Sequence, residues 1–151
     1  NFNKIESSNE LGTLIDNITG ETFSTDRIAL DPEFGLKIAN KRYKNWINDE
    51  FQKDNTDIFT ISENGTDIGF IMAKNLNKSE TDLLLGGIFT KFQGGGYGFN
   101  IVYQPIRHYS SEGKTLLRTK VSSNNLDIIK FYIAMGYRID DIDYILIKHE
   151  K

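Results

Sequence analysis

The sequence contains no cysteine among its 151 residues. This absence excludes a disulfide framework, a zinc site with thiolate ligands and a cysteine nucleophile. It fits a protein of the reducing cytosol, and we expect a cytoplasmic location. Only two prolines are present, and the chain has no proline-rich linker, repeat or low-complexity tract. A length of 151 residues then predicts a single domain with its own hydrophobic core.

Long apolar runs and dense basic clusters are also missing. No run approaches the roughly 18 apolar residues that span a membrane, and no signal peptide is recognisable. The formal net charge is -3 and the isoelectric point is about 5.4. We therefore expect neither a membrane nor a nucleic acid as partner. Because the first residue is asparagine and not methionine, the natural start of the chain is left open.

The hydrophobic period changes along the chain and predicts the secondary structure. A weak helical pattern covers residues 11–18, and a stronger one covers residues 30–51, where Asp31 would cap the helix and Pro32 would occupy its first position. Residues 57–75 alternate as in strands on both sides of Asn64-Gly65, a pair typical of hairpin turns.

The second half continues with alternating strands and helices. Strands are predicted over residues 81–90, 115–122 and 142–150, and helices over 97–113 and 124–137. The adjacent Gly86 and Gly87 indicate a bulge or a close approach within the first of these strands. The whole order predicts a mixed, mainly antiparallel α/β sheet with helices on both faces.

Four glycines are concentrated in the segment FQGGGYGFN, residues 92–100, between a strand and a helix. Backbone N–H groups at the start of a helix have no partners within the helix, and the helix dipole favours anions there. Glycines allow a bulky anion to come close because they carry no Cβ. The segment is therefore either a diphosphate cradle or a flexible turn.

Two common phosphate motifs do not match this segment. A P-loop needs Gly-Lys-Ser/Thr, but Gly98 is followed by Phe99 and Asn100. A dinucleotide fingerprint needs a third glycine at a fixed spacing and an acidic residue about 20 positions later. The glycines here do not provide that spacing, and the next strand ends in Ser122-Ser123 with no acidic residue.

A third pattern does match. QGGGYG, residues 93–98, resembles Q/R-x-x-G-x-G/A, the pyrophosphate loop of the GNAT superfamily of N-acyltransferases. NLDIIKFYIAMGY, residues 125–137, resembles the second signature of that family, N-x-x-A-x-x-x-Y-x-x-x-G-F/Y, with Ile128 in place of the usual alanine. The resemblance covers residues 57–148, and residues 25–51, TDRIALDPEF and the helix after it, faintly resemble acetyltransferases that act on nucleotide-linked amino sugars.

The resemblance implies the GNAT-like acyl-CoA N-acyltransferase fold in one domain, residues 1–151. Residues 1–55 would form the acceptor side and residues 56–151 the acyl-CoA-binding core. The implied reaction moves an acetyl group from acetyl-CoA to a primary amine of a small molecule, with a nucleotide-linked amino sugar as first candidate, by direct attack in a ternary complex. No metal is implied, and the oligomeric state, monomer or homodimer, stays open.

Within this resemblance, Tyr132 is the catalytic acid that protonates the departing CoA thiolate, and Asn125 faces the pantetheine arm. The strand 81–90 would separate from the strand 115–122, and the arm would fill the gap. The implied acyl-CoA contacts are Ile88, Phe89, Thr90, Gln93, Gly94, Gly96, Tyr97, Gly98, Phe99 and Asn125. Asn125 is also a plain candidate for a helix N-cap, and Tyr132 for a core aromatic residue.

Two features depart from the family pattern, and the general base is not fixed. Gln93 stands where arginine is more frequent, and Pro105 inside the helix 97–113 predicts a kink. Candidates for the base are Glu80, Asp82, His108 or a water chain. Trp46, Phe51 and Tyr43 are candidates for either the acceptor pocket or the core.

Three other functions remain open at this point. The protein could acetylate a protein or peptide amine. It could be an acyl-CoA sensor without catalytic activity, which would need the glycine segment but not Tyr132. It could also be an α/β domain whose glycine segment binds nothing.

Overall fold

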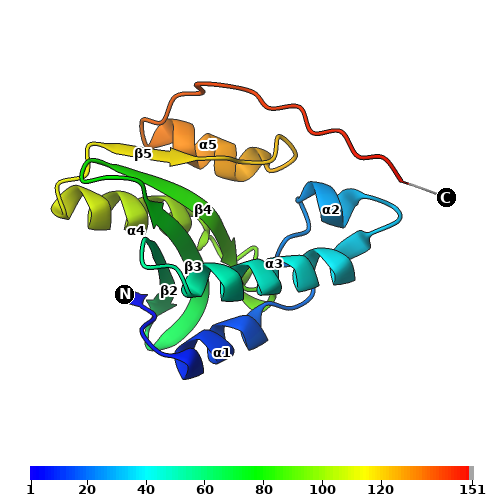
Figure 1. Ribbon diagram of the computed structural model, residues 1–151, viewed down its shortest axis with the longest axis horizontal. Coiled ribbons are helices and arrows are strands. Elements are labelled where there is room, and N and C mark those ends of the chain that lie inside the picture. The colour runs from blue at the N-terminus through cyan, green and yellow to red at the C-terminus, as the bar shows by residue number, and fades with distance from the viewer. Residues whose placement is uncertain (150–151) are drawn as a thin grey trace.

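The computed structural model describes residues 1–149, which form a twisted sheet with helices around it (Figure 1). Along the chain the elements are β1 (Phe2–Lys4), α1 (Ser8–Asn17), α2 (Arg27–Leu30), α3 (Gly35–Phe51), β2 (Thr56–Glu63), β3 (Thr66–Asn75), β4 (Glu80–Ile88), the 3-10 turn η1 (Thr90–Phe92), α4 (Gly98–Ser111), β5 (Leu116–Thr119) and α5 (Leu126–Ala134).

The strands form one sheet in the order β1-β2-β3-β4-β5. The pairs from β1 to β4 are antiparallel, and β5 pairs with β4 in parallel. This confirms the predicted mixed, mainly antiparallel sheet. Strand β1 was not predicted, because three residues are too few to show an alternating pattern.

The hairpin predicted at Asn64-Gly65 is confirmed. Both residues have positive φ, at 50° and 78°, and they join β2 to β3. Two positive φ angles match the twist of the flanking strands, which explains the preference for asparagine and glycine there.

Each face of the sheet is covered by its own set of helices. Apolar side chains of α1 and α3 pack on one face, against Ile58, Phe70 and Met72. Side chains of α4 and α5 pack on the other face, against Phe59 and Ile71. Along each strand, side chains that face α3 alternate with side chains that face α4 and α5, as the period of a strand requires. We call these two sides the α3 face and the α4–α5 face.

The predicted helix over residues 30–51 is wrong at its start. The structure divides it into α2 and α3, with a turn at residues 31–34. The Asp31 carboxylate accepts a hydrogen bond from the Glu33 N–H at 2.9 Å, so it stabilises that turn instead of capping a helix. Asp26 caps α2 by accepting from the Ile28 N–H.

The predicted last strand, 142–150, is also wrong over its described part, because residues 142–149 belong to no helix or strand. Residue 150 lies outside the described residues. Residues 138–149, here named the C-terminal arm, leave the end of α5 and run past α2 (Figure 1). Its alternating sequence fits a strand, but the arm pairs with no strand of the described chain.

Candidate active site at the fork between β4 and β5

The parallel strands β4 and β5 pair over only a short distance and then separate. Their register runs from Glu80 opposite Leu116 to Leu83 opposite Thr119. Strand β4 continues to Ile88, while β5 ends at Thr119. The predicted separation of these two strands is thereby confirmed, and we call it the fork.

The register of β4 determines which of its peptide groups face the fork. The Phe89 N–H donates to the Ile68 carbonyl at 2.9 Å, so Phe89 is hydrogen-bonded toward β3. Because hydrogen-bonded positions alternate in antiparallel pairs, the peptide groups of Gly86 and Ile88 point to the opposite side, toward the fork. The Ile88 N–H is thus a candidate donor, whereas the Phe89 N–H is already used.

The glycine segment lies between the end of β4 and the start of α4. Gly94 and Gly96 have φ angles of 76° and 80°, which side chains with a Cβ rarely adopt. A Cβ built on either residue would meet no atom within 4 Å. The backbone here is open to an incoming group.

Consecutive N–H groups at this point have no acceptor within the described chain. Among residues 1–149, the N–H groups of Gly96, Tyr97, Gly98 and Phe99 donate to no protein atom. The N-cap of α4, Tyr97, supplies no side-chain cap. Unsatisfied donors at the positive end of a helix form an anion-binding site.

Two predicted contact residues use their side chains to fix the glycine segment. The Gln93 amide donates to the Ile88 carbonyl at 3.0 Å and to the Glu21 carbonyl at 3.2 Å. The Thr90 hydroxyl donates to the Thr19 carbonyl and lies 3.2 Å from the Thr22 hydroxyl. These side chains connect the segment to residues 19–22, and Gln93 therefore has a positional role that the sequence did not suggest.

Asn125 is the N-cap of α5. Its side-chain oxygen accepts a hydrogen bond from the Ile128 N–H at 3.4 Å. The plain N-cap interpretation is therefore confirmed. Within the described chain, the Asn125 amide N–H₂ makes no hydrogen bond, so it stays available for a ligand.

Tyr132 is 7% exposed and lies at the fork. Burial raises the pKa of its hydroxyl, and the neighbouring Thr119 side chain lowers that pKa in part. The Thr119 hydroxyl donates to the Leu83 carbonyl at 3.2 Å. Thr119 and Leu83 are the last paired residues before the strands separate, so the Tyr132 hydroxyl lies at the apex of the fork.

The three candidate bases have different surroundings. Glu80 pairs with Arg118 at 3.2 Å, and His108 pairs with Glu112 at 3.3 Å on α4. Asp82 has a buried Oδ1 atom with no hydrogen-bond partner in the described chain. Of the three, Asp82 alone combines a position one residue before the fork with an unsatisfied carboxylate oxygen.

Asp82 and Tyr132 approach the fork from opposite faces of the sheet. Leu83 packs on the α4–α5 face, so its neighbour Asp82 faces α3. Leu117 also packs on the α4–α5 face, and Thr119, two residues later, shares that side with Tyr132. An acid on one side of a gap and a base on the other could act on different groups, the acid on a leaving group and the base on an attacking group.

Of the aromatic residues considered for the acceptor pocket, Tyr43 belongs to the core, and Trp46 and Phe51 are partly buried beside it. Tyr43 is buried and its hydroxyl donates to Asp26 at 2.5 Å. The Trp46 indole donates to Glu50 at 3.1 Å, and Trp46 and Phe51 pack against the core of the α3 face. A shallow groove along α3 is lined by Ile38, Lys41, Arg42, Asn45, Trp46 and Asp49.

Residues 1–149 contain no group of histidine and acidic side chains arranged to hold a metal ion. In the same range, no helix has the length and apolar character needed to span a membrane.

Sequence reasoning missed Thr119. A threonine near the end of a predicted strand carries no signal of its own, because its role depends on which residue of β4 it faces. The sequence did indicate the residue that Thr119 faces. The seven-residue spacing of Asn125 and Tyr132 places both on one side of α5.

Solved structures with the same architecture share little sequence with this chain. The Bacillus subtilis protein YycN, assigned as an acetyltransferase, has a TM-score of 0.69 and 15% identity, and the match covers 99% of this chain and 100% of YycN. A GNAT-family protein from Desulfovibrio desulfuricans has a TM-score of 0.67 and 12% identity, with 93% and 86% covered.

A third structure is the aminoglycoside N-acetyltransferase AAC(6')-Iy in complex with CoA. It has a TM-score of 0.60 and 13% identity, with 98% of this chain and 93% of that chain covered. At these identities the likeness establishes the fold alone. No curated protein matches the chain significantly in sequence.

The family is established by the sequence itself. The profile of the acetyltransferase (GNAT) family matches residues 21–137, which is most of the chain and includes the glycine segment, the fork and α5. The chain therefore belongs to the GNAT acetyltransferase family and is an acyl-CoA-dependent N-acyltransferase.

Proposed function

We propose that this protein transfers an acetyl group from acetyl-CoA to a primary amine of a small molecule. The pyrophosphate would bind the free N–H groups of residues 96–99, and the pantetheine arm would lie in the fork beside Asn125. The observation that supports this proposal best is the position of Tyr132, whose hydroxyl lies at the apex of the fork. A thioester in the fork would place its sulfur near that hydroxyl.

The proposed reaction is direct aminolysis in a ternary complex. The neutral amine attacks the acetyl carbonyl carbon, the C–S bond breaks, and Tyr132 gives its proton to the leaving thiolate. A thiol has a pKa of about 8.5 and a tyrosine of about 10, so Tyr132 is protonated at neutral pH and can serve as the acid. Asp82 accepts the proton that the amine loses, from the opposite face of the sheet.

The Ile88 N–H is the proposed donor to the carbonyl oxygen. This oxygen gains negative charge in the transition state, and a fixed N–H group in a site with little water stabilises it by about 3 kcal/mol. The Ile88 N–H faces the fork because of the register with β3. We do not assign this role to Phe89, whose N–H donates to Ile68.

We propose, as expected from the sequence, that residues 1–55 form the acceptor side and that residues 56–151 bind acetyl-CoA. As acceptor we propose an amino sugar, with nucleotide-linked amino sugars as the first compounds to test. Two of the solved structures with this fold are described as aminoglycoside acetyltransferases, and aminoglycosides are built from amino sugars.

The test is a thiol-release assay with acetyl-CoA and a panel of amines. The panel contains nucleotide-linked amino sugars, aminoglycosides and basic peptides, and thiol release is compared with hydrolysis in the absence of amine. We expect release above hydrolysis with an amino sugar. Release with peptides alone would reject the proposed acceptor class while preserving the acetyl-CoA site.

Calorimetry with CoA tests the cofactor site separately. The expected result is saturable binding to the wild-type protein. If CoA does not bind and no amine releases thiol, both the site and the function are rejected.

A further inference from the structure

Lys120 is the first residue beyond the apex of the fork on the β5 side. Thr119, the residue before it, pairs with Leu83, and the two strands separate from there. Because the Thr119 side chain lies beside Tyr132 on the α4–α5 face, the next side chain points to the opposite side of the sheet, toward α3. Lys120 therefore lies at the mouth of the fork on the α3 face.

Lys120 shares this face with Asp82, the proposed base. Asp82 is opposite Arg118 in the register between β4 and β5, two residues before Lys120. The pKa of Lys120 is raised mainly by its hydrogen bond with Asp143 and, to smaller degrees, by the charges of Asp141 and Asp82. Two residues of a strand span about 7 Å, so an anion at Lys120 and an amine at Asp82 would be separated by roughly the width of one sugar ring.

The charge of Lys120 is not neutralised by the sheet itself. Its neighbour Arg118 pairs with Glu80 of β4 at 3.2 Å, so those two charges balance each other. Lys120 instead lies 2.5 Å from Asp143 of the C-terminal arm, and 90% of the Lys120 side chain is exposed. A cation at the mouth of the fork is thus accessible from solvent.

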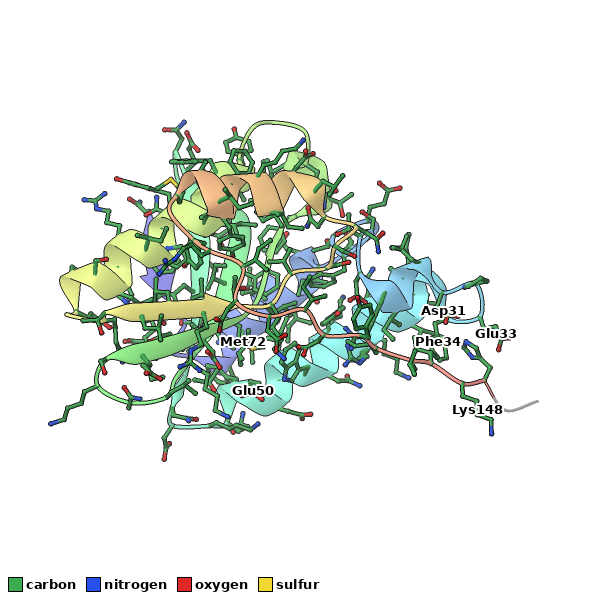
Figure 2. All side chains as sticks on the ribbon, turned by 90° about the horizontal axis from the view of Figure 1, so that it is seen from above. Asp31, Glu33, Phe34, Glu50, Met72 and Lys148 are labelled. Carbon is green, nitrogen blue, oxygen red and sulfur yellow. The ribbon has the colours of Figure 1, made fainter. Side chains whose placement is uncertain are left out.

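The contact with Asp143 shows that this position holds an anion. Figure 2 shows the arm passing the end of β5 and continuing to Asp31, Glu33 and Phe34, at the turn before α3. Where it passes Lys120, the arm contributes one carboxylate, and ion pairs between exposed side chains add little to stability. A ligand with a stronger negative charge can therefore replace the Asp143 carboxylate at small cost.

We propose that Lys120 binds a phosphate group of the acceptor and thereby selects phosphorylated amino sugars over uncharged ones. This inference rests on the proposed transfer of an acetyl group to an amino sugar. The amine would lie beside Asp82, and the phosphate would take the place of the Asp143 carboxylate. A lysine ammonium is a compact cation with three donors, which suits a phosphate group. Because a phosphate monoester carries more negative charge than a carboxylate, it should displace Asp143.

The first experiment compares acceptors that differ by one phosphate. Glucosamine and glucosamine 1-phosphate are assayed by thiol release at saturating acetyl-CoA, with the wild type, Lys120→Gln and Lys120→Arg. In the wild type we expect kcat/KM to be about fivefold higher for the phosphorylated sugar, through a lower KM. Lys120→Gln should bring the ratio of the two values to about one, whereas Lys120→Arg should keep the preference because it keeps the charge.

Lys114→Gln is the matched control, because Lys114 lies beside the other end of β5 and donates to the Asn77 carbonyl at 2.8 Å. It should keep the preference of the wild type. Asp143→Asn removes the carboxylate that competes with the phosphate, so this variant should lower the KM for glucosamine 1-phosphate. An unchanged preference in Lys120→Gln, or equal kcat/KM for the two sugars in the wild type, overturns the proposal.

Calorimetry separates this inference from the proposed reaction. Glucosamine 1-phosphate is titrated into protein saturated with CoA, so that the phosphates of CoA already occupy their own site. We expect saturable binding that Lys120→Gln weakens about fivefold, while the affinity for CoA itself stays the same. Such binding without thiol release from any amine would support the anion site and reject the proposed reaction. No binding to the CoA complex, or a loss of CoA affinity in Lys120→Gln, overturns the anion site.

Discussion

The side chain of Tyr132 lies beside that of Thr119, the last residue of β5 that pairs with β4. A helix and a strand thereby fix one functional group at the point where the sheet opens. Burial raises the pKa of this hydroxyl, and the Thr119 contact offsets that effect in part. The same position would be an ordinary core site if the strands stayed paired beyond Thr119.

Replacing Tyr132 by phenylalanine should lower kcat by about 10²–10⁴-fold, because the acid that protonates the leaving thiolate is lost. The affinity for CoA, measured by calorimetry, should stay unchanged. Tyr137→Phe is the matched control. The ring centroids of Tyr137 and Tyr132 are 4.8 Å apart, and the buried Tyr137 hydroxyl has no partner in the described chain. Equal loss of activity in both variants would contradict the assignment.

The raised pKa of Tyr132 also predicts the shape of the pH profile. An acid must be protonated to act, and a raised pKa keeps it protonated to a higher pH. Activity of the wild type should therefore show no loss from this group between pH 7 and its ordinary pKa of about 10. A decline below pH 9 that Tyr132→Phe abolishes would show that the pKa is not raised.

Gly96→Ala should weaken CoA binding about tenfold. The new Cβ would enter the open space in front of the free N–H groups, and the φ of 80° adds backbone strain of roughly 1–2 kcal/mol. Gly113→Ala is the control, because Gly113 also has a φ of 80° with open space around it but lies beyond the other end of α4. Both variants should lose similar stability in urea, and only the first should lose CoA affinity.

Asp82→Asn should lower kcat by roughly 100-fold at neutral pH, because the amide cannot accept the proton of the attacking amine. Activity should recover in part as the pH rises, since more of the amine is then already neutral. Glu80→Gln removes a nearby carboxylate that is paired with Arg118, and it should have little effect on the rate. A D82N variant with the wild-type rate at pH 7 would leave proton removal to water.

Tyr109→Phe should raise the free energy of unfolding by about 1 kcal/mol at pH 7. The Tyr109 hydroxyl is fully buried and has no partner in the described chain, and such a group costs about 1–3 kcal/mol. Tyr43→Phe should have the opposite effect, because that hydroxyl donates to Asp26. Urea unfolding of the three proteins measures both changes.

The same pair of variants tests the alkaline limit of stability. Burial, followed by the charges of Asp57 and Glu112, raises the pKa of Tyr109 in the folded state. Because the group ionises above pH 10 in the unfolded chain but stays protonated in the folded one, the stability falls as the pH rises from about 10 toward the folded pKa. Above pH 10, Tyr109→Phe should therefore lose less stability than the wild type.

Local signals in the sequence were sufficient for most of the fold. Asn64-Gly65 specified the hairpin, and the change of hydrophobic period located β2 to β5, α4 and α5, because these features depend on neighbouring residues. The start of α3 was wrong because Asp31 and Pro32 are equally suited to a turn. Pro105 does lie inside α4, and the kink expected there stays a prediction.

For the site, the two signatures indicated the glycine segment, Asn125 and Tyr132. They could not indicate that the Phe89 N–H is used by β3, or that Gln93 binds backbone carbonyls, because both depend on register and folding back of the chain. The prediction of a last strand was wrong over residues 142–149 for a related reason. An alternating pattern shows that a segment suits a sheet, but not which edge receives it.

Gln93 and Thr90 attach the turn after β4 to the backbone at Glu21 and Thr19. These side chains connect residues 19–22, on the proposed acceptor side, to the turn that leads into the proposed pyrophosphate site. Binding of acetyl-CoA should order that turn and residues 19–22 together, so each substrate is expected to bind more tightly once its companion is in place.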